Sequence, residues 1–258
     1  MKRLILVEGL PGTGKTTMTQ RIAQRLAAKG EAVTALYEGD ERIPCDFYEM
    51  AGIPLGEFEA FRAEHLNVED ARWVISLRTA SYVYLRLDRC ADFAADAFRK
   101  WDMGDERNLQ ASVAHYVPCA LERLDAWVDS YKDSGETVVI DSGFLQNPIN
   151  ELLFRGASDD EACSFVQGIL HRFGPLHPVC VYLQRESAEA AVSFAKQAKG
   201  SDWASRVEAL LAELNCPDLF ARRYALEQKL LPLLPHILCP VRGADWSGAD
   251  REIERLFV

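Results

Sequence analysis

The sequence lacks the paired cysteines and clustered histidines of a structural zinc site or a disulfide framework. Its seven cysteines are scattered singly, no Cys-x-x-Cys pair occurs, and there are only five histidines. This usage is typical of reduced, partly buried thiols, so we expect the protein to be cytoplasmic.

Basic charge and long apolar runs are also scarce. Lysine and arginine number 29 against 39 aspartates and glutamates, which gives a net charge of -10. Such an acidic balance argues against general binding to nucleic acid or to an anionic membrane. The apolar run Leu4–Val7 is too short for a signal peptide, and no later run approaches the length of a membrane span. We therefore expect neither partner, and any phosphate must be held in a local positive site.

One motif near the N-terminus carries chemical information. Residues 9–16 read GLPGTGKT, which matches the phosphate-loop pattern Gly-x-x-x-x-Gly-Lys-Thr. They follow a short apolar strand predicted over Arg3–Val7 and precede a helix predicted over Thr16–Lys29, where apolar residues recur every four positions. A second strand is predicted over Ala32–Tyr37. Together these elements form a βαβ unit, which requires a parallel sheet.

The composition of this loop suits a nucleotide. Glycines let backbone N–H groups converge on phosphate oxygens, and the N-terminus of the following helix adds positive potential. We expect Lys15 to reach the β- and γ-phosphates, Thr16 to ligate magnesium and Thr17 to touch the α-phosphate. The residues predicted to form the nucleotide site are Gly9, Pro11, Gly12, Thr13, Gly14, Lys15, Thr16 and Thr17.

Carboxylates end two of the predicted strands. The third strand, Thr137–Ile140, is followed by Asp141, which could hold magnesium directly or through water, or could cap a turn. Because the C-terminal ends of parallel strands share one edge, Glu38 at the end of the second strand could take a proton from a hydroxyl attacking the γ-phosphate. It could equally lie in an exposed acidic turn with Asp40, which is a further candidate for binding substrate. Glu8 is expected to anchor the backbone of the phosphate loop.

Four other polar residues are candidates for binding substrate. Gln146 and Asn147 follow the third strand at the same predicted edge, where they could also form a turn ahead of a helix. Lys196 and Lys199 lie with Arg185 after the fourth strand. Movable positive charge there could close over a transferring phosphoryl group, or the lysines could belong to a solvated helix face.

The rest of the chain reads as alternating helices and strands within a single domain of residues 1–258. Strands over Val179–Leu183 and Ile237–Val241 bring the predicted parallel sheet to five, with helices on both faces. Residues 39–56 are predicted as an irregular connection, and residues 57–101 as helices. With a long helix over Asn108–Tyr131, they form an expected helical cap over about residues 57–133. The other helices are predicted over Asp159–Phe173, Ser187–Ala198, Trp203–Leu214, Asp218–Leu231 and Ala249–Leu256.

The chain resembles the nucleoside and nucleotide kinase-like branch of the P-loop NTPases, which includes the thymidylate kinases. The similarity rests on Glu8-Gly9 before the loop, Glu38 after the second strand and Asp141-Ser142 after the third. The chain is also similar to a group of bacterial P-loop proteins that share an acidic residue followed by Phe-x-Gln-Asn-Pro, here Phe144 to Pro148.

This resemblance implies ATP as the phosphoryl donor, magnesium as the cofactor and a mobile lid. It implies catalytic roles for Lys15, Glu38 and Asp141. Ser142 stands where the resemblance leads us to expect an arginine, and no arginine occurs between Glu186 and Ser205. Because lysine does not reproduce the planar fork of arginine, a nucleoside monophosphate is in doubt as the acceptor.

Two classes of function remain. The first is ATP- and magnesium-dependent transfer of the γ-phosphoryl group to a hydroxyl or phosphate of a small molecule such as a nucleoside, a nucleotide or a natural product. The second is a P-loop ATPase or switch that acts on a protein partner, against which stand the large insert and the absence of an Asn-Lys-x-Asp signature. A binding module without activity is supported only by the missing lid arginines. The sequence does not identify the phosphoryl acceptor, and it leaves open whether two copies of the chain form a homodimer.

Overall fold

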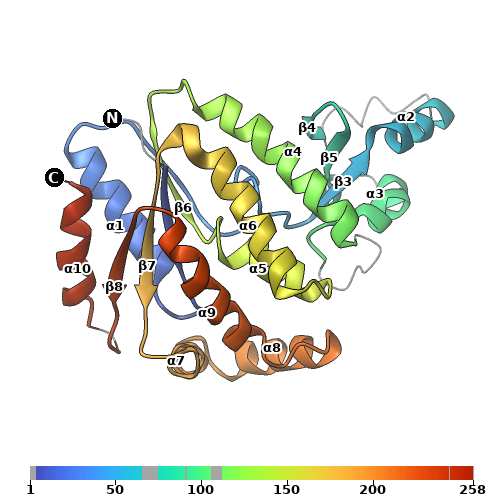
Figure 1. Ribbon diagram of the computed structural model, residues 1–258. Helices are drawn as coiled ribbons and strands as arrows, with labels where there is room; N and C mark the ends of the chain where they lie inside the picture. Colours follow the sequence, from blue (N-terminus) through green and yellow to red (C-terminus); the bar gives the residue numbers. More distant parts are fainter. Residues whose placement is uncertain (1–3, 66–74, 91, 106–111, 244, 258) are drawn as a thin grey trace.

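The computed structural model describes residues 4–65, 75–90, 92–105, 112–243 and 245–257, and its centre is a five-stranded sheet (Figure 1). The strand order is β2-β6-β1-β7-β8, and every neighbouring pair is parallel. This confirms the predicted sheet. The strands are β1 (Leu4–Gly9), β2 (Val33–Leu36), β6 (Thr137–Asp141), β7 (Pro178–Gln184) and β8 (His236–Pro240). Arg3 of the predicted first strand lies outside the described residues.

Both faces of this sheet are covered, because successive side chains of a strand point in opposite directions. Leu4 and Leu6 of β1 enter one core, whereas Ile5 and Val7 enter another. Figure 1 shows the helices that supply the other side of each core. On the first face they are α4 (Val113–Tyr131), α5 (Gln146–Phe154), α6 (Asp159–Phe173) and α9 (Leu219–Leu230); on the second they are α1 (Lys15–Ala28) and α10 (Ser247–Ile253).

The helices of the second half agree with the sequence pattern. Between β7 and α9 the chain forms α7 (Ala188–Lys199) and α8 (Ser201–Glu213). A capping box begins α6, since the Ser158 side chain accepts from the Glu161 N–H and the Glu161 side chain accepts in return. The predicted helix over Asn108–Tyr131 is α4, and residues 108–111 of that prediction lie outside the described residues.

The insert after β2 differs from the prediction. In place of an irregular connection and helices alone, it contains an antiparallel sheet of order β3-β5-β4, drawn away from α10 in Figure 1. Its elements are β3 (Met50–Pro54), α2 (Leu55–Glu64), β4 (Ile75–Arg78), β5 (Tyr82–Arg86) and α3 (Asp92–Phe98). The cap is therefore mixed, and the single-domain organisation stays a prediction.

Alternation along β5 explains this correction. Val83 and Leu85 point into a small core of the insert, whereas Tyr84 points into the main core and donates a 2.7 Å hydrogen bond to the Cys119 carbonyl. A five-residue segment that is buried on both sides has no polar face, so its apolar run did not distinguish strand from helix. Within the described ranges, no helix combines the length and apolarity needed to cross a bilayer.

Candidate functional site

The loop between β1 and α1 requires glycine at three positions. Gly9, Gly12 and Gly14 have φ values of 141°, 75° and 89°, which residues with a side chain rarely adopt. There is also no room for a side chain. A Cβ would lie 2.5 Å from the Leu183 carbonyl oxygen at Gly9, 2.8 Å from the Ala195 Cα at Gly12 and 1.9 Å from the Trp246 ring at Gly14. The loop is therefore packed against the chain on several sides.

Polar groups around this loop are arranged as an anion site. Helix α1 begins at Lys15 with no side-chain cap, which leaves its first-turn N–H groups available to a phosphate. The Thr13 hydroxyl donates to the Leu10 carbonyl at 2.8 Å, so this side chain closes the loop. Arg185, directly after β7, supports the loop, because its guanidinium donates to the Gly12 carbonyl at 3.0 Å and lies over the Phe194 ring.

Lys15 lines a cavity above the loop but is only 7 % exposed. Its Nζ donates a long hydrogen bond, 3.4 Å, to the Leu10 carbonyl. Burial lowers the pKa of its ammonium, and the positive charge of Arg223 lowers it further, against the opposing effect of Asp141 and Glu38. An anion in the cavity would favour the charged ammonium and so act against both effects.

The two predicted metal ligands lie next to each other although they are far apart in the sequence. The Thr16 hydroxyl donates to Asp141 Oδ2 at 2.6 Å, and Oδ1 of the fully buried Asp141 accepts from the Ser142 hydroxyl at 2.7 Å. Ser142 thus orients this carboxylate from the position where an arginine was expected. Among the described residues, no group of three or more His, Cys, Asp or Glu side chains could hold a metal ion. Magnesium would instead take oxygen ligands from Thr16, Asp141 and phosphate, a set that suits it.

Glu8 anchors a different loop from the one predicted. Its carboxylate is fully buried and accepts the backbone N–H groups of Phe144 at 2.7 Å, Leu145 at 3.0 Å and Gln146 at 3.2 Å. These bonds hold the start of α5 against β1. Burial raises the pKa of Glu8 from 4.5 to about 7, although the N–H groups of Leu145 and Phe144 act in the opposite direction.

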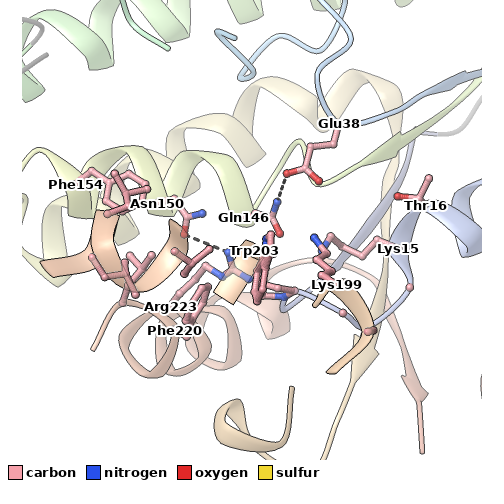
Figure 2. Close-up of a pocket in the computed structure, with 18 of the residues that line it drawn as sticks. Lys15, Thr16, Glu38, Gln146, Asn150, Phe154, Lys199, Trp203, Phe220 and Arg223 are labelled. Carbon is pink, nitrogen blue, oxygen red and sulfur yellow. Dashed lines mark hydrogen bonds between the residues drawn. The ribbon is translucent and has the colours of Figure 1, made fainter. Parts of the chain in front are cut away.

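Glu38 faces the cavity from beyond β2. The strand ends at Leu36, so Glu38 lies in the following turn, where it is exposed. The Gln146 side chain donates to its Oε1 at 2.8 Å, as Figure 2 shows. Glu38 lines two cavities at once. One, of about 470 Å³, also contains Lys15, and the other, of about 230 Å³, contains Asn147.

The remaining candidates are dispersed. Lys199 lines the larger cavity, and its ammonium lies 5.0 Å from the centre of the Trp203 ring. Lys196 pairs with Glu208 at 2.5 Å and lines neither of these two cavities. Asp40 pairs with Arg42 at 2.7 Å and also lines neither. Gln146, Asn147 and Lys199 are thus near Glu38 or Lys15, whereas Asp40 and Lys196 have local partners.

Three helices supply a wall that sequence reasoning missed, apart from Gln146. Their contributing residues recur at helical spacing and are mostly apolar or aromatic. They are Gln146, Asn150 and Phe154 on α5, Trp203, Val207, Leu210 and Leu211 on α8, and Leu219, Phe220 and Arg223 on α9. A signal was present for Arg223, because it and Glu227 place opposite charges four residues apart within an otherwise apolar helix face.

No family model matches this sequence, and no curated protein matches it. Among solved structures, the chain is similar to the structure of deoxyadenosine kinase from M. mycoides with bound dATP, with a TM-score of 0.43 and 13 % sequence identity. The match covers 99 % of this chain and 100 % of that chain.

Proposed function

We propose that the protein transfers the γ-phosphoryl group of ATP to a small-molecule acceptor, with magnesium as its cofactor. The observation that carries this proposal is the 2.6 Å contact between Thr16 and Asp141 beside a complete phosphate loop. A hydroxyl and a buried carboxylate in contact at that position suit a hard cation that is shared with phosphate oxygens. The same edge of the sheet presents the exposed carboxylate of Glu38.

The donor would be held chiefly by backbone. Backbone N–H groups of the phosphate loop, to which Pro11 contributes none, and of the first turn of α1 would bind phosphate oxygens, and Lys15 would balance their charge. Magnesium held by Thr16 and Asp141 would neutralise charge on the phosphates.

Glu38 would act on the acceptor. Its exposed carboxylate can accept the proton of an acceptor hydroxyl, and the hydrogen bond from Gln146 fixes its direction. The smaller cavity beside it is lined by further polar side chains, among them Asp46, Asn147 and Glu151. This lining favours an acceptor with several hydroxyl groups.

The test is a screen for ADP release that depends on the acceptor. Nucleosides, nucleotides and hydroxylated antibiotics would each be added to the protein with ATP and magnesium, and the product identified by mass. The Lys15→Ala protein is the matched control. Release of ADP by the wild-type protein at one rate whatever the acceptor would contradict the proposal and favour an ATPase or switch.

A further inference from the structure

The larger cavity changes in character along its length. Beside the phosphate loop it presents Lys15 and Lys199, farther along it presents Asn150 and Arg223, and its end is aromatic. Figure 2 shows these side chains around one space, with Phe154 and Phe220 at the end away from Thr16. Of the described residues that line the cavity, three are cationic and one, Glu38, is a carboxylate. The cavity therefore favours an anion in a protein whose net charge is -10.

Arg223 is held in place on one side only. It is 1 % exposed, its Nη1 donates to Asn150 Oδ1 at 3.2 Å, and its Nε lies 3.1 Å from Glu227 Oε1. Glu227 is fully buried and accepts the hydroxyl of Tyr182 at 2.6 Å. Among the described residues, Nη2 of Arg223 has no hydrogen-bond partner. Figure 2 shows the guanidinium turned toward Asn150 and into the cavity.

A second buried arginine shows what a purely structural role looks like in this protein. Arg123 on α4 is 5 % exposed, and its two terminal nitrogens donate to the carbonyls of Pro44, Asp46 and Glu41. Those bonds tie the segment after β2 to the main core. Within the described part of the chain Arg223 has no such set of acceptors, and a buried donor left unpaired is costly. The cost is recovered when an oxyanion enters the cavity.

We propose that Arg223 binds phosphoryl oxygens in this cavity, in concert with Lys15. This inference rests on the proposed function, because it assigns a further residue to the same site. Arginine presents a planar fork of donors that matches phosphate, which neither Lys196 nor Lys199 can do. The oxygens belong either to the terminal phosphate of the donor or to a phosphate on the acceptor.

The experiment compares nucleotide binding by the wild-type protein and three variants. In the double variant Arg223→Gln with Glu227→Gln, both charges of the buried pair are removed, so no carboxylate is left unpaired. Arg223→Lys keeps the positive charge but lacks the planar set of guanidinium donors, and it replaces the double variant in the comparison if that protein does not fold. Arg222→Gln is the matched control, since this neighbouring arginine pairs with Asp159 at the surface. Calorimetry would measure binding of MgATP, of MgADP, and of inorganic phosphate to the MgADP-loaded protein.

We expect the Arg223 variants to bind either MgATP or inorganic phosphate about tenfold or more weakly than the wild type does. Arg222→Gln should bind both as the wild type does. Weaker MgATP binding with unchanged MgADP binding supports the inference and assigns the oxygens to the donor. Unchanged nucleotide binding with weaker phosphate binding supports it and assigns them to the acceptor. Equal losses for MgATP and MgADP would indicate a distorted loop and overturn the inference, as would no loss at all. A wild-type protein that binds neither nucleotide would instead overturn the proposed function itself.

Discussion

Glu8 links the stability of the protein to pH. In the folded state burial raises its pKa from 4.5 to about 7, so the folded protein holds a proton that the unfolded chain releases across this interval. The stability that this proton confers is fully present below about pH 4.5 and is lost as the pH rises through about 7. The difference between the two pKa values corresponds to about 3 kcal/mol in the free energy of unfolding. Replacing Glu8 by glutamine should remove this dependence.

Urea denaturation of the wild-type and Glu8→Gln proteins at about pH 5 and about pH 8 measures the effect. The wild type should exceed the variant in unfolding free energy by about 2.5 kcal/mol more at the lower pH, since the effect is not quite complete at about pH 5. The contributions of other titrating groups cancel in the comparison. The carbonyl oxygen of a glutamine side chain can still accept the backbone N–H groups of Phe144 and Leu145. Its NH₂ group, however, faces the backbone N–H of Gln146. A difference that is constant with pH, or larger at about pH 8, would refute the reasoning and show that the three N–H donors keep the buried Glu8 ionised.

Three substitutions test the phosphoryl-transfer site. Lys15→Ala should abolish acceptor-dependent ADP release with an unchanged circular dichroism melting curve, because the side chain lines a cavity and makes one long hydrogen bond; wild-type turnover would contradict the phosphate-loop assignment. Asp141→Asn should raise the magnesium concentration required for ADP release by about tenfold or more, because the amide lacks the charge that a hard cation prefers. Unchanged magnesium dependence would leave Asp141 only its bonds to Thr16 and Ser142. Glu38→Gln should slow single-turnover transfer by about a hundredfold while nucleotide affinity is retained, since the amide still accepts from Gln146; collapse of ATP binding would show that Glu38 has a structural role.

The parallel sheet could be predicted because its information is local. Each strand is a short apolar run bounded by a turn or a helix, and the Gly-Lys-Thr loop specifies the order strand, loop, helix. The insert carries no comparable signal. Strand β5 has the sequence Tyr-Val-Tyr-Leu-Arg, and its alternation is visible only once Tyr84 and Val83 are known to face different cores. Its pairing with β3 and β4 depends on contacts that no local pattern contains.

The candidate site divides in the same way. Lys15, Thr16 and Asp141 belong to motifs whose place at the sheet edge follows from topology, and the structure brings Thr16 and Asp141 into contact. Asn150 and Arg223 come from helices whose relative placement only the folded chain determines. The sequence shows that Lys196 is charged but does not show its ion-pair partner, which in the structure is Glu208. Surface charge alone therefore does not distinguish a substrate contact from a local ion pair.

The close packing of Gly12 against α7 has a consequence for how substitutions combine. A Cβ at position 12 would lie 2.8 Å from the Ala195 Cα. The size of the residue at position 12 is therefore limited by α7, although the two positions are distant in the sequence. An added methyl group at position 12 would press on α7 itself, because the nearest atoms are the Cα, Cβ and backbone N of Ala195, which no change of side-chain rotamer can move away. Helix α7 ends at Lys199, one of the residues that line the larger cavity. A change in size at this glycine would therefore act at a distance, on the width of the cavity between α7 and the phosphate loop and hence on which molecules can enter it.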